Sequence, residues 1–318
     1  MASTTSIDGT IVNAGTVIGA GTNGVGIMMY SGITGSGPSP EIRNSGLISG
    51  TSMGVNLQAP DGRLVNEEGG EIVGGQYGVF VGGGTGLAAT VINHGTIRTA
   101  GSNLVLYLSI DADKVVNDGA IYGNVYLSYG NDTFDNRGGS VDGQIQGGDG
   151  NDTLIIDKAK YKLTEIAGQG DLDTVKSSVS YVLSDNVEKP VLIGSKDISG
   201  TGTARGDLLY GNVGNNALKG LAGSDNLSGG KGNDRLTGGG DADTFHFATG
   251  YGKDTITDFE QGIDTIDLSA WKEITNFRQV KGHAEDHAAD LWISDGGDTL
   301  IVKHLHKADL AGGDFDFL

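Results

Sequence analysis

Residues 220–236 read Gly220-Leu221-Ala222-Gly223-Ser224-Asp225-Asn226-Leu227-Ser228-Gly229-Gly230-Lys231-Gly232-Asn233-Asp234-Arg235-Leu236, which is one nine-residue unit written almost twice. The same period of nine holds from residue 202 to residue 245. Each unit begins with Gly, has Asp or Asn at its sixth position and has a large apolar residue at its eighth position. The sixth positions are Asp207, Asn216, Asp225, Asp234 and Asp243, and the eighth are Leu209, Leu218, Leu227, Leu236 and Phe245. A short fixed period of this kind predicts stacked repeats.

Further copies of the unit lie outside this stretch, at residues 129–134 and 147–154, and a looser copy lies at 250–256. With Gly229, Gly230, Gly232, Asp234 and Leu236 in their places, the unit resembles the haemolysin-type (RTX) calcium-binding repeat. The resemblance extends to nearly everything after residue 129. Segments 254–269 and 314–318 resemble the C-terminal cap and the uncleaved export signal of that family, which implies type I secretion from a Gram-negative bacterium.

The resemblance also implies a parallel β-roll, in which two units form one coil and loops 18 residues apart hold calcium between them. One row of ligands would be Asp207, Asp225 and Asp243, and the other would be Asn216, Asp234 and Asp254. Asp132 and Asp152 would form a separate pair at the end of the preceding repeats. Asn216 carries no charge, so we expect its site to be weaker than the neighbouring sites.

Calcium takes six to eight oxygen ligands, and small residues allow backbone carbonyls to converge beside a carboxylate. The predicted metal-binding residues are Asp132, Gly147, Asp149, Asp152, Gly202, Asp207, Gly211, Asn216, Gly220, Asp225, Gly229, Lys231, Gly232, Asp234, Gly238, Gly240, Asp241, Asp243 and Asp254. Without calcium the stacked carboxylates repel one another, so we expect the roll to fold only when ions bind.

A different repeat, apolar-x-Asn-x-Gly-x-apolar, occupies the first part of the chain. It recurs around Asn13, Asn44, Asn66, Asn93, Asn117 and Asn136. A second apolar run follows most copies, so we expect two short strands in each coil of a parallel solenoid. The Asn side chains are expected to form an internal ladder at a corner, hydrogen-bonded from coil to coil. Over about residues 10 to 145 the pattern resembles the β-helical repeats of autotransporter and haemagglutinin-like surface proteins, which implies an extracellular surface role.

The composition agrees with a repeat protein that binds cations. The chain has 318 residues with 57 Gly, 4 Pro and no Cys, and its formal net charge is −19. The missing Cys residues exclude disulfides and thiolate metal sites, and the negative charge argues against nucleic acid as a partner. The sequence has no apolar stretch of the roughly 20 residues that span a membrane. Its first residues lack the basic and apolar regions of a cleaved signal, so we expect export by another route.

We therefore predict an all-β protein, with an N-terminal parallel β-solenoid followed by a calcium-binding parallel β-roll and a small C-terminal β cap. The predicted domains are 1–157 (the solenoid, with two RTX-like loops at its end), 158–200 (a connecting β segment), 201–256 (the RTX β-roll) and 257–318 (the cap with the secretion signal).

The expected function is that of a secreted calcium-binding protein that folds outside the cell and acts as an adhesin-like or structural module at a surface or in a matrix. Its expected partners are calcium, the type I secretion machinery and extracellular polysaccharide or a cell surface. Two alternatives stay open, a polysaccharide lyase or epimerase and a calcium-dependent glycan lectin.

No catalytic residues and no cofactor besides calcium are predicted. An enzyme would draw first on Tyr107, His94 and Arg98, which fall at different phases of the repeat. A lectin would need an exposed aromatic row. The candidate rings are Tyr30, Tyr77, Phe80, Tyr107, Tyr122 and Tyr126, and their phase beside inward positions places most of them in the core or at its rim.

Overall fold

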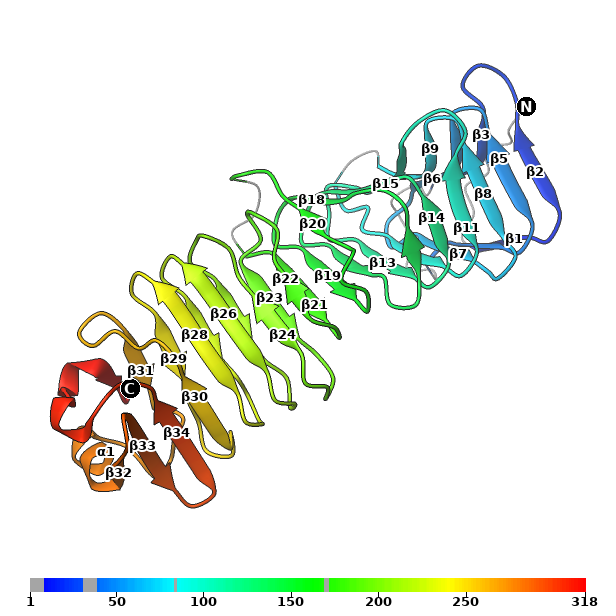
Figure 1. Ribbon diagram of the computed structural model, residues 1–318. Coiled ribbons are helices and arrows are strands. Elements are labelled where there is room, and N and C mark those ends of the chain that lie inside the picture. Colours follow the sequence, from blue (N-terminus) through cyan, green and yellow to red (C-terminus); the bar gives the residue numbers. More distant parts are fainter. Residues whose placement is uncertain (1–8, 31–38, 83–84, 169–171) are drawn as a thin grey trace. The chain divides into compact units, whose positions relative to one another are not determined.

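The computed structural model describes residues 9–30, 39–82, 85–168 and 172–318. Contacts divide the chain into two compact units, Met1–Asp173 (unit 1) and Thr174–Leu318 (unit 2). Both units are built almost entirely from short parallel strands, as the all-β prediction requires (Figure 1). The boundary between the units falls inside the stretch 158–200, for which the sequence predicts a connecting segment.

Unit 1 is a solenoid with three strands in each complete coil, one on each of three faces. Face A contains β1 (Thr10–Asn13), β4 (Glu41–Asn44), β7 (Arg63–Asn66), β10 (Thr90–Asn93), β13 (Lys114–Asn117), β16 (Thr133–Asp135) and β19 (Thr153–Ile156). Face B contains β2 (Thr16–Gly19), β5 (Leu47–Gly50), β8 (Glu71–Gly74), β11 (Thr96–Thr99), β14 (Ala120–Tyr122) and β17 (Ser140–Val141). Face C contains β3 (Val25–Tyr30), β6 (Met53–Gln58), β9 (Tyr77–Val81), β12 (Leu104–Tyr107), β15 (Asn124–Tyr129), β18 (Ile145–Asp149) and β20 (Leu163–Thr164).

The expectation of two strands in each N-terminal coil is wrong, because the Asn of the repeat ends one strand and the chain bends before the next strand begins. Asn44 is the last residue of β4, and its Oδ1 accepts a hydrogen bond from the Gly46 N–H (3.3 Å). This local hydrogen bond closes a tight bend. The apolar residues on either side of the bend therefore belong to two faces and not to one strand.

The predicted Asn ladder is confirmed. Each Asn Nδ2 donates to the Asn Oδ1 of the next coil at 2.6 to 2.8 Å, in the order Asn13, Asn44, Asn66, Asn93, Asn117 and Asn136. From Asn44 onward these side chains have no exposed surface. Because an amide both donates and accepts, each Asn from Asn44 to Asn117 is linked to the coils on both sides. The ladder ends at Asn136, whose Nδ2 has no partner among the described residues.

The core of unit 1 consists of three apolar stacks, one behind each face. On face B, Val17, Ile48, Ile72, Ile97 and Ile121 lie in successive register positions. Equivalent stacks run behind faces A and C, for example Ile42 against Leu64 and Val55 against Val79. No coil can bury its own apolar face, so each one depends on its neighbours.

Unit 2 is a two-sided roll. One sheet contains β21 (Thr174–Ser177), β23 (Lys189–Leu192), β25 (Leu208–Tyr210), β27 (Asn226–Ser228), β29 (Thr244–His246), β31 (Thr265–Asp267) and β35 (Phe315–Asp316). The other contains β22 (Tyr181–Val182), β24 (Ser199–Thr201), β26 (Ala217–Ala222), β28 (Arg235–Gly240), β30 (Lys253–Ile256), β34 (Asp298–Val302), β33 (Asp290–Asp295) and β32 (Ala284–His287). The residue at the eighth position of every repeat points inward, so Leu209, Leu227 and Phe245 stack on one side.

The last part of unit 2 closes the roll with apolar packing. Strands β32, β33 and β34 are antiparallel, and α1 (Phe277–His283) lies beside them with η1 (Lys307–Asp309) and η2 (Gly312–Asp314). Trp271, Ile274 and Val280 are fully buried there and belong to the same core as Leu236 and Phe245. The helices of the described segments are too short or too polar to cross a membrane.

Candidate metal centre

The acidic residues of the repeats stack in two rows along unit 2. In both rows the backbone N–H of one residue donates to the side-chain Oδ1 of the residue 18 to 20 positions later. The hydrogen bonds are Asp207 to Asp225 (2.8 Å), Asp225 to Asp243 (2.9 Å), Asn216 to Asp234 (2.7 Å) and Asp234 to Asp254 (2.9 Å). The structure therefore brings together the two rows that the family resemblance implied.

Four of these carboxylates have one oxygen without a partner. Within the described segments, Oδ2 accepts no hydrogen bond in Asp225, Asp234, Asp243 or Asp254, and all four residues are at most 2% exposed. An ionised oxygen that is buried without a partner is unfavourable. Ca²⁺ binds carboxylate oxygens of this kind at about 2.3 to 2.6 Å. The residues present therefore fit a hard divalent cation.

The first glycine of each unit keeps space open in front of this oxygen. Gly220, Gly229 and Gly238 each lie against the Oδ2 atom of the Asp five residues later, and a Cβ atom at any of them would overlap that oxygen. Gly202 and Gly211 have the same place relative to the sixth residue of their own units. Any larger residue would displace the Asp or Asn side chain at the sixth position, which explains glycine at the first position of these five units.

Burial makes the metal-free carboxylates hard to ionise. It raises the pKa of Asp225 to about 7 and that of Asp254 to about 8. For Asp234 and Asp243 burial raises the pKa to about 6. A bound cation favours the ionised form of each group, so protons and metal compete for these oxygens.

The first member of each row is satisfied by the chain itself. Asp207 Oδ2 accepts from the Thr203 N–H (2.5 Å) and from Thr203 Oγ1 (3.1 Å). Asn216 Oδ1 accepts from the Asn212 N–H (2.7 Å), and its Nδ2 donates to Ile198 O (3.1 Å). The strongest candidates for metal ligation therefore begin at the third repeat, and not at the first as the spacing alone suggests.

A third row lies in unit 1, where the sequence predicts the pair Asp132 and Asp152. The N–H of Asp132 donates to Asp152 Oδ1 (2.8 Å), so the two are adjacent. The row is longer than predicted, because Asp113 N–H donates to Asp132 (2.6 Å) and Asp152 N–H donates to Asp173 (2.7 Å). Burial raises the pKa of Asp132 to about 9 and that of Asp152 to about 6.

Three of the predicted metal-binding positions have no carboxylate in the rows. Asp241 is exposed, and its Oδ2 accepts from the Gly223 N–H (3.1 Å) at the outer turn. Lys231 is exposed and cationic, so only its backbone carbonyl is suited to a metal. Gly240 has nothing within 4 Å of the place where a Cβ would sit, so no crowding requires glycine there.

The other predicted positions lie in the tight turns. Gly232 has φ +127° and donates its N–H to Tyr251 O (2.9 Å). Gly147 lies against the carboxylates of Asp152 and Glu165. Asp149 is half-buried at the end of β18.

Several acidic residues that the repeat pattern does not predict lie at the rows or near them. Asp264 continues the first row by accepting from the Asp243 N–H (3.0 Å), and Asp258 accepts from the N–H of Gly238, the first residue of a unit (3.0 Å). Asp113, Asp173 and Asp264 share a signal with the repeat, because each is followed after one residue by Val or Ile. That short pattern, without the glycines, would have found them.

The family model of the RTX calcium-binding nonapeptide repeat matches the chain in four copies, at residues 137–155, 201–236, 210–245 and 220–254. These are RTX repeats. RTX repeats bind calcium, with several ions in each array. Three of the four copies lie in unit 2, which contains the unpartnered Oδ2 atoms of Asp225, Asp234, Asp243 and Asp254. A search of curated protein sequences finds no match.

Two solved structures are similar to parts of the chain. One is the AlgE6R3 subunit of the Azotobacter vinelandii mannuronan C5-epimerase, with 27% identity over 39% of this chain and 81% of its own, and a TM-score of 0.33. The other is the extracellular lipase LipA from Serratia marcescens, with 16% identity over 69% of this chain and 40% of its own, and a TM-score of 0.31. Both likenesses are partial.

The three residues named first for an enzyme lie on different parts of unit 1. Tyr107 is on face C and Arg98 is on face B, where its guanidinium forms an ion pair with Glu71 (2.6 Å). His94 lies in the bend between β10 and β11, with its Nδ1 2.7 Å from Asp118. The structure does not bring the three together.

Proposed function

We propose that the protein is a secreted, calcium-dependent binding module of the adhesin type, whose solenoid binds extracellular polysaccharide. In this proposal unit 2 stays unfolded in the low calcium of the cytosol, passes through a type I secretion channel and folds on calcium outside the cell. The resemblance of segments 254–269 and 314–318 to the family's cap and export signal supports that route. The raised pKa values of the buried carboxylates support folding that depends on calcium.

A row of aromatic rings on face C is the observation that carries the binding role. Phe80, Tyr107 and Tyr126 occupy one register row on β9, β12 and β15. The Phe80 and Tyr107 rings are stacked with 5.3 Å between centroids, and the Tyr107 and Tyr126 rings meet edge to face at 5.4 Å. Tyr77 joins the row, 5.8 Å from Tyr107.

These rings point away from the core. Tyr107 lies between Leu106 and Leu108, and Tyr126 lies between Val125 and Leu127, and these four neighbours are at most 1% exposed. Since side chains alternate across a strand, the rings face outward and remain partly accessible. Aromatic faces suit the apolar faces of sugar rings, and the ~4.8 Å strand spacing lets a row of them follow an extended polymer.

The test is retention of intact polymer by the calcium-loaded protein. We expect the wild type to be retained by at least one member of a panel of acidic and neutral bacterial and plant polysaccharides. Tyr107→Ala and Tyr126→Ala should each weaken retention by about tenfold, which corresponds to roughly 1.4 kcal/mol of lost ring contact. Tyr122→Ala is the matched control, because Tyr122 is an exposed tyrosine on face B.

Polymer size is followed in the same samples. A fall in polymer size would replace the binding module with a polysaccharide-acting enzyme. Retention that the Tyr107 and Tyr126 variants leave unchanged would remove the aromatic row from the proposal, and no retention on any polymer would overturn the polysaccharide role.

A further inference from the structure

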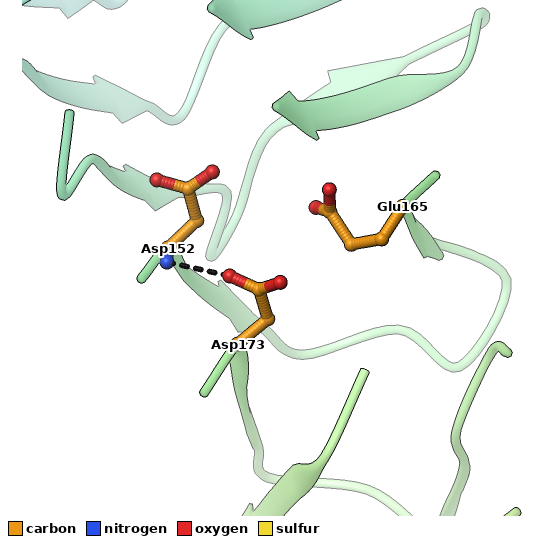
Figure 2. Close-up of side chains that lie close together, drawn as sticks. All are labelled: Asp152, Glu165 and Asp173. Carbon is orange, nitrogen blue, oxygen red and sulfur yellow. Dashed lines mark hydrogen bonds between the residues drawn. The ribbon is translucent and has the colours of Figure 1, made fainter. Parts of the chain in front are cut away.

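Three carboxylates meet at the end of unit 1, where the repeat copy at 147–154 is not followed by another copy. They belong to Asp152, Glu165 and Asp173, and one ligand oxygen from each lies within 4.8 Å of the others. Figure 2 shows the three carboxylates facing a common space from three separate segments of the chain. All three residues are buried.

The backbone fixes the position of Glu165. Strand β20 pairs with β18, with Ile145 opposite Leu163 and Gln146 opposite Thr164, so the next residue, Glu165, comes opposite Gly147. Its Oε1 accepts from the Gly147 N–H and its Oε2 from the Gly148 N–H, both at 3.1 Å. Glu165 therefore occupies the place that the first glycine of a following repeat would have taken.

The backbone also fixes the two Asp side chains. The Asp152 N–H donates to Asp173 Oδ1 (2.7 Å), and this bond is drawn as a dashed line in Figure 2. Asp152 Oδ1 accepts from the Asp132 N–H (2.8 Å). Both residues thus continue the spacing of the row, although Asp173 lies outside the matched repeat.

Asp152 points an unpartnered oxygen into the cluster. The residue is 1% exposed, and its Oδ2 has no hydrogen-bond partner among residues 9–30, 39–82, 85–168 and 172–318. A Cβ atom on Gly147 would overlap both this oxygen and Glu165 Oε1, so the two oxygens border the same small space. No Lys, Arg or His in those segments forms an ion pair with Asp152. An uncompensated buried carboxylate of this kind calls for a cation.

We propose that Asp152, Glu165 and Asp173 form a calcium site of unit 1, in which one carboxylate from a repeat is completed by two carboxylates that lie outside the nonapeptide pattern. The inference deepens the calcium dependence of the proposed function and rests on it. An oxygen-only ligand set selects a hard cation, and affinity for Ca²⁺ rises with the number of charged ligands. With three carboxylates, this site fills at lower calcium than the array of unit 2.

The experiment counts the calcium ions bound to the full-length chain by native mass spectrometry over a calcium titration. The double variant Glu165→Gln/Asp173→Asn should bind one ion fewer than the wild type, and the missing ion should be one that binds early in the titration. Either single variant should lower the affinity for that ion by about tenfold or more. Asp142→Asn removes an exposed acid from unit 1 and should bind as many ions as the wild type.

Stability separates a metal site from a merely structural cluster. Neutralising the cluster should stabilise unit 1 in EDTA, because like charges no longer repel, and should destabilise it in calcium, because the ion is lost. Hydrogen exchange of residues 114–156 reports on this unit. An unchanged ion count, or a variant that is destabilised or unfolded in EDTA as well as in calcium, would overturn the site.

The variant Asp225→Asn tells the two failures apart. If Asp225→Asn lowers calcium uptake in unit 2 and the double variant does not change uptake, only the site in unit 1 is rejected. If neither variant changes calcium uptake, the calcium dependence of the proposed function is rejected with it.

Discussion

The Asn ladder of unit 1 and the Asp rows of unit 2 both stack one short polar side chain per coil, but they differ in the donor that links the coils. In both, the side-chain Oδ1 accepts a hydrogen bond of 2.8 to 2.9 Å from the coil before it, from an Asn Nδ2 in unit 1 and from an Asp backbone N–H in unit 2. An amide donates through Nδ2 and accepts through Oδ1, so a stack of Asn side chains is self-sufficient. A carboxylate only accepts, so each added Asp brings one more charge and one more unsatisfied oxygen.

The difference shows how a repeat protein acquires a requirement for metal. The coils linked by Asn side chains need no cation, because they carry no buried charge in the ladder. The coils linked by Asp side chains need a bound cation to compensate their buried carboxylates. Measurements on the two ladders can test whether only the Asp rows require calcium.

The largest effect should come from removing calcium. In EDTA we expect amides within residues 208–256 to lose nearly all protection from hydrogen exchange, because stacked buried carboxylates repel and lose their cations. Amides within residues 41–126, where the Asn ladder runs, should keep theirs. Equal loss of protection in the two regions would mean that the Asn ladder does not stabilise its coils independently.

Breaking the Asn ladder should be the next largest effect. Asn93→Ala leaves the Asn66 Nδ2 donor and the Asn117 Oδ1 acceptor without their partner. Each buried group left unsatisfied costs ~1–3 kcal/mol. Urea unfolding of unit 1 should show this loss of unfolding free energy equally with and without calcium. Asn103→Ala is the control, because Asn103 is exposed. A loss that calcium abolishes would contradict the separation of the two ladders.

Acidification should stabilise the metal-free array. Burial raises the pKa of Asp225 to about 7 and that of Asp254 to about 8, above the value of about 3.9 in an unfolded chain. Stability from these groups is fully present below pH ~4 and is lost as the pH rises through 6 to 8. Circular dichroism in EDTA should therefore show more β structure at pH 5 than at pH 8. With calcium the trend reverses, because protons then displace the ion. Metal-free protein that gains structure as the pH rises would refute this account.

The smallest effect should come from converting one ladder type into the other at a single position. Asn216→Asp adds a carboxylate to the second row. It also removes the Nδ2 group that donates a hydrogen bond to Ile198 O. We expect calcium affinity of the array to rise several-fold and its residual stability in EDTA to fall. Asn215→Asp makes the same charge change at an exposed neighbour. Identical calcium titrations for the two variants would show that the position in the row does not matter.

The sequence was sufficient to predict the stacking in both units. A strict period of nine places Asp225 and Asp243 at the same position of successive coils. The recurring Asn-x-Gly places the Asn side chains of unit 1 at the same position of successive coils. The sequence does not show the bend itself, because the turn after Asn44 depends on a hydrogen bond from the Gly46 N–H to the Asn44 side chain.

Other parts of the candidate site depend on residues that follow no pattern. Thr203 and Asn212 satisfy the first members of the rows, and neither belongs to the fixed positions of the repeat. Glu165 belongs to no sequence motif. Only the pairing of β20 with β18 shows that it lies opposite Gly147. The outward direction of Tyr107 follows a register shift between Leu104 and Leu106, where Val105 and Leu106 are both buried in succession.

The hydrogen bonds of both ladders run in one direction along the chain, and this has a consequence for the length of the protein. Every Asp-laddered coil presents a donor to the coil after it and an acceptor to the coil before it. Whole coils are therefore interchangeable modules. Loss of residues 220–237 would place Asp243 next to Asp207 and allow the Asp207 N–H to donate to Asp243 Oδ1, as it now donates to Asp225 Oδ1. Loss of nine residues would instead exchange the two rows. Such an array can become longer or shorter during evolution in steps of 18 residues without passing through a defective intermediate.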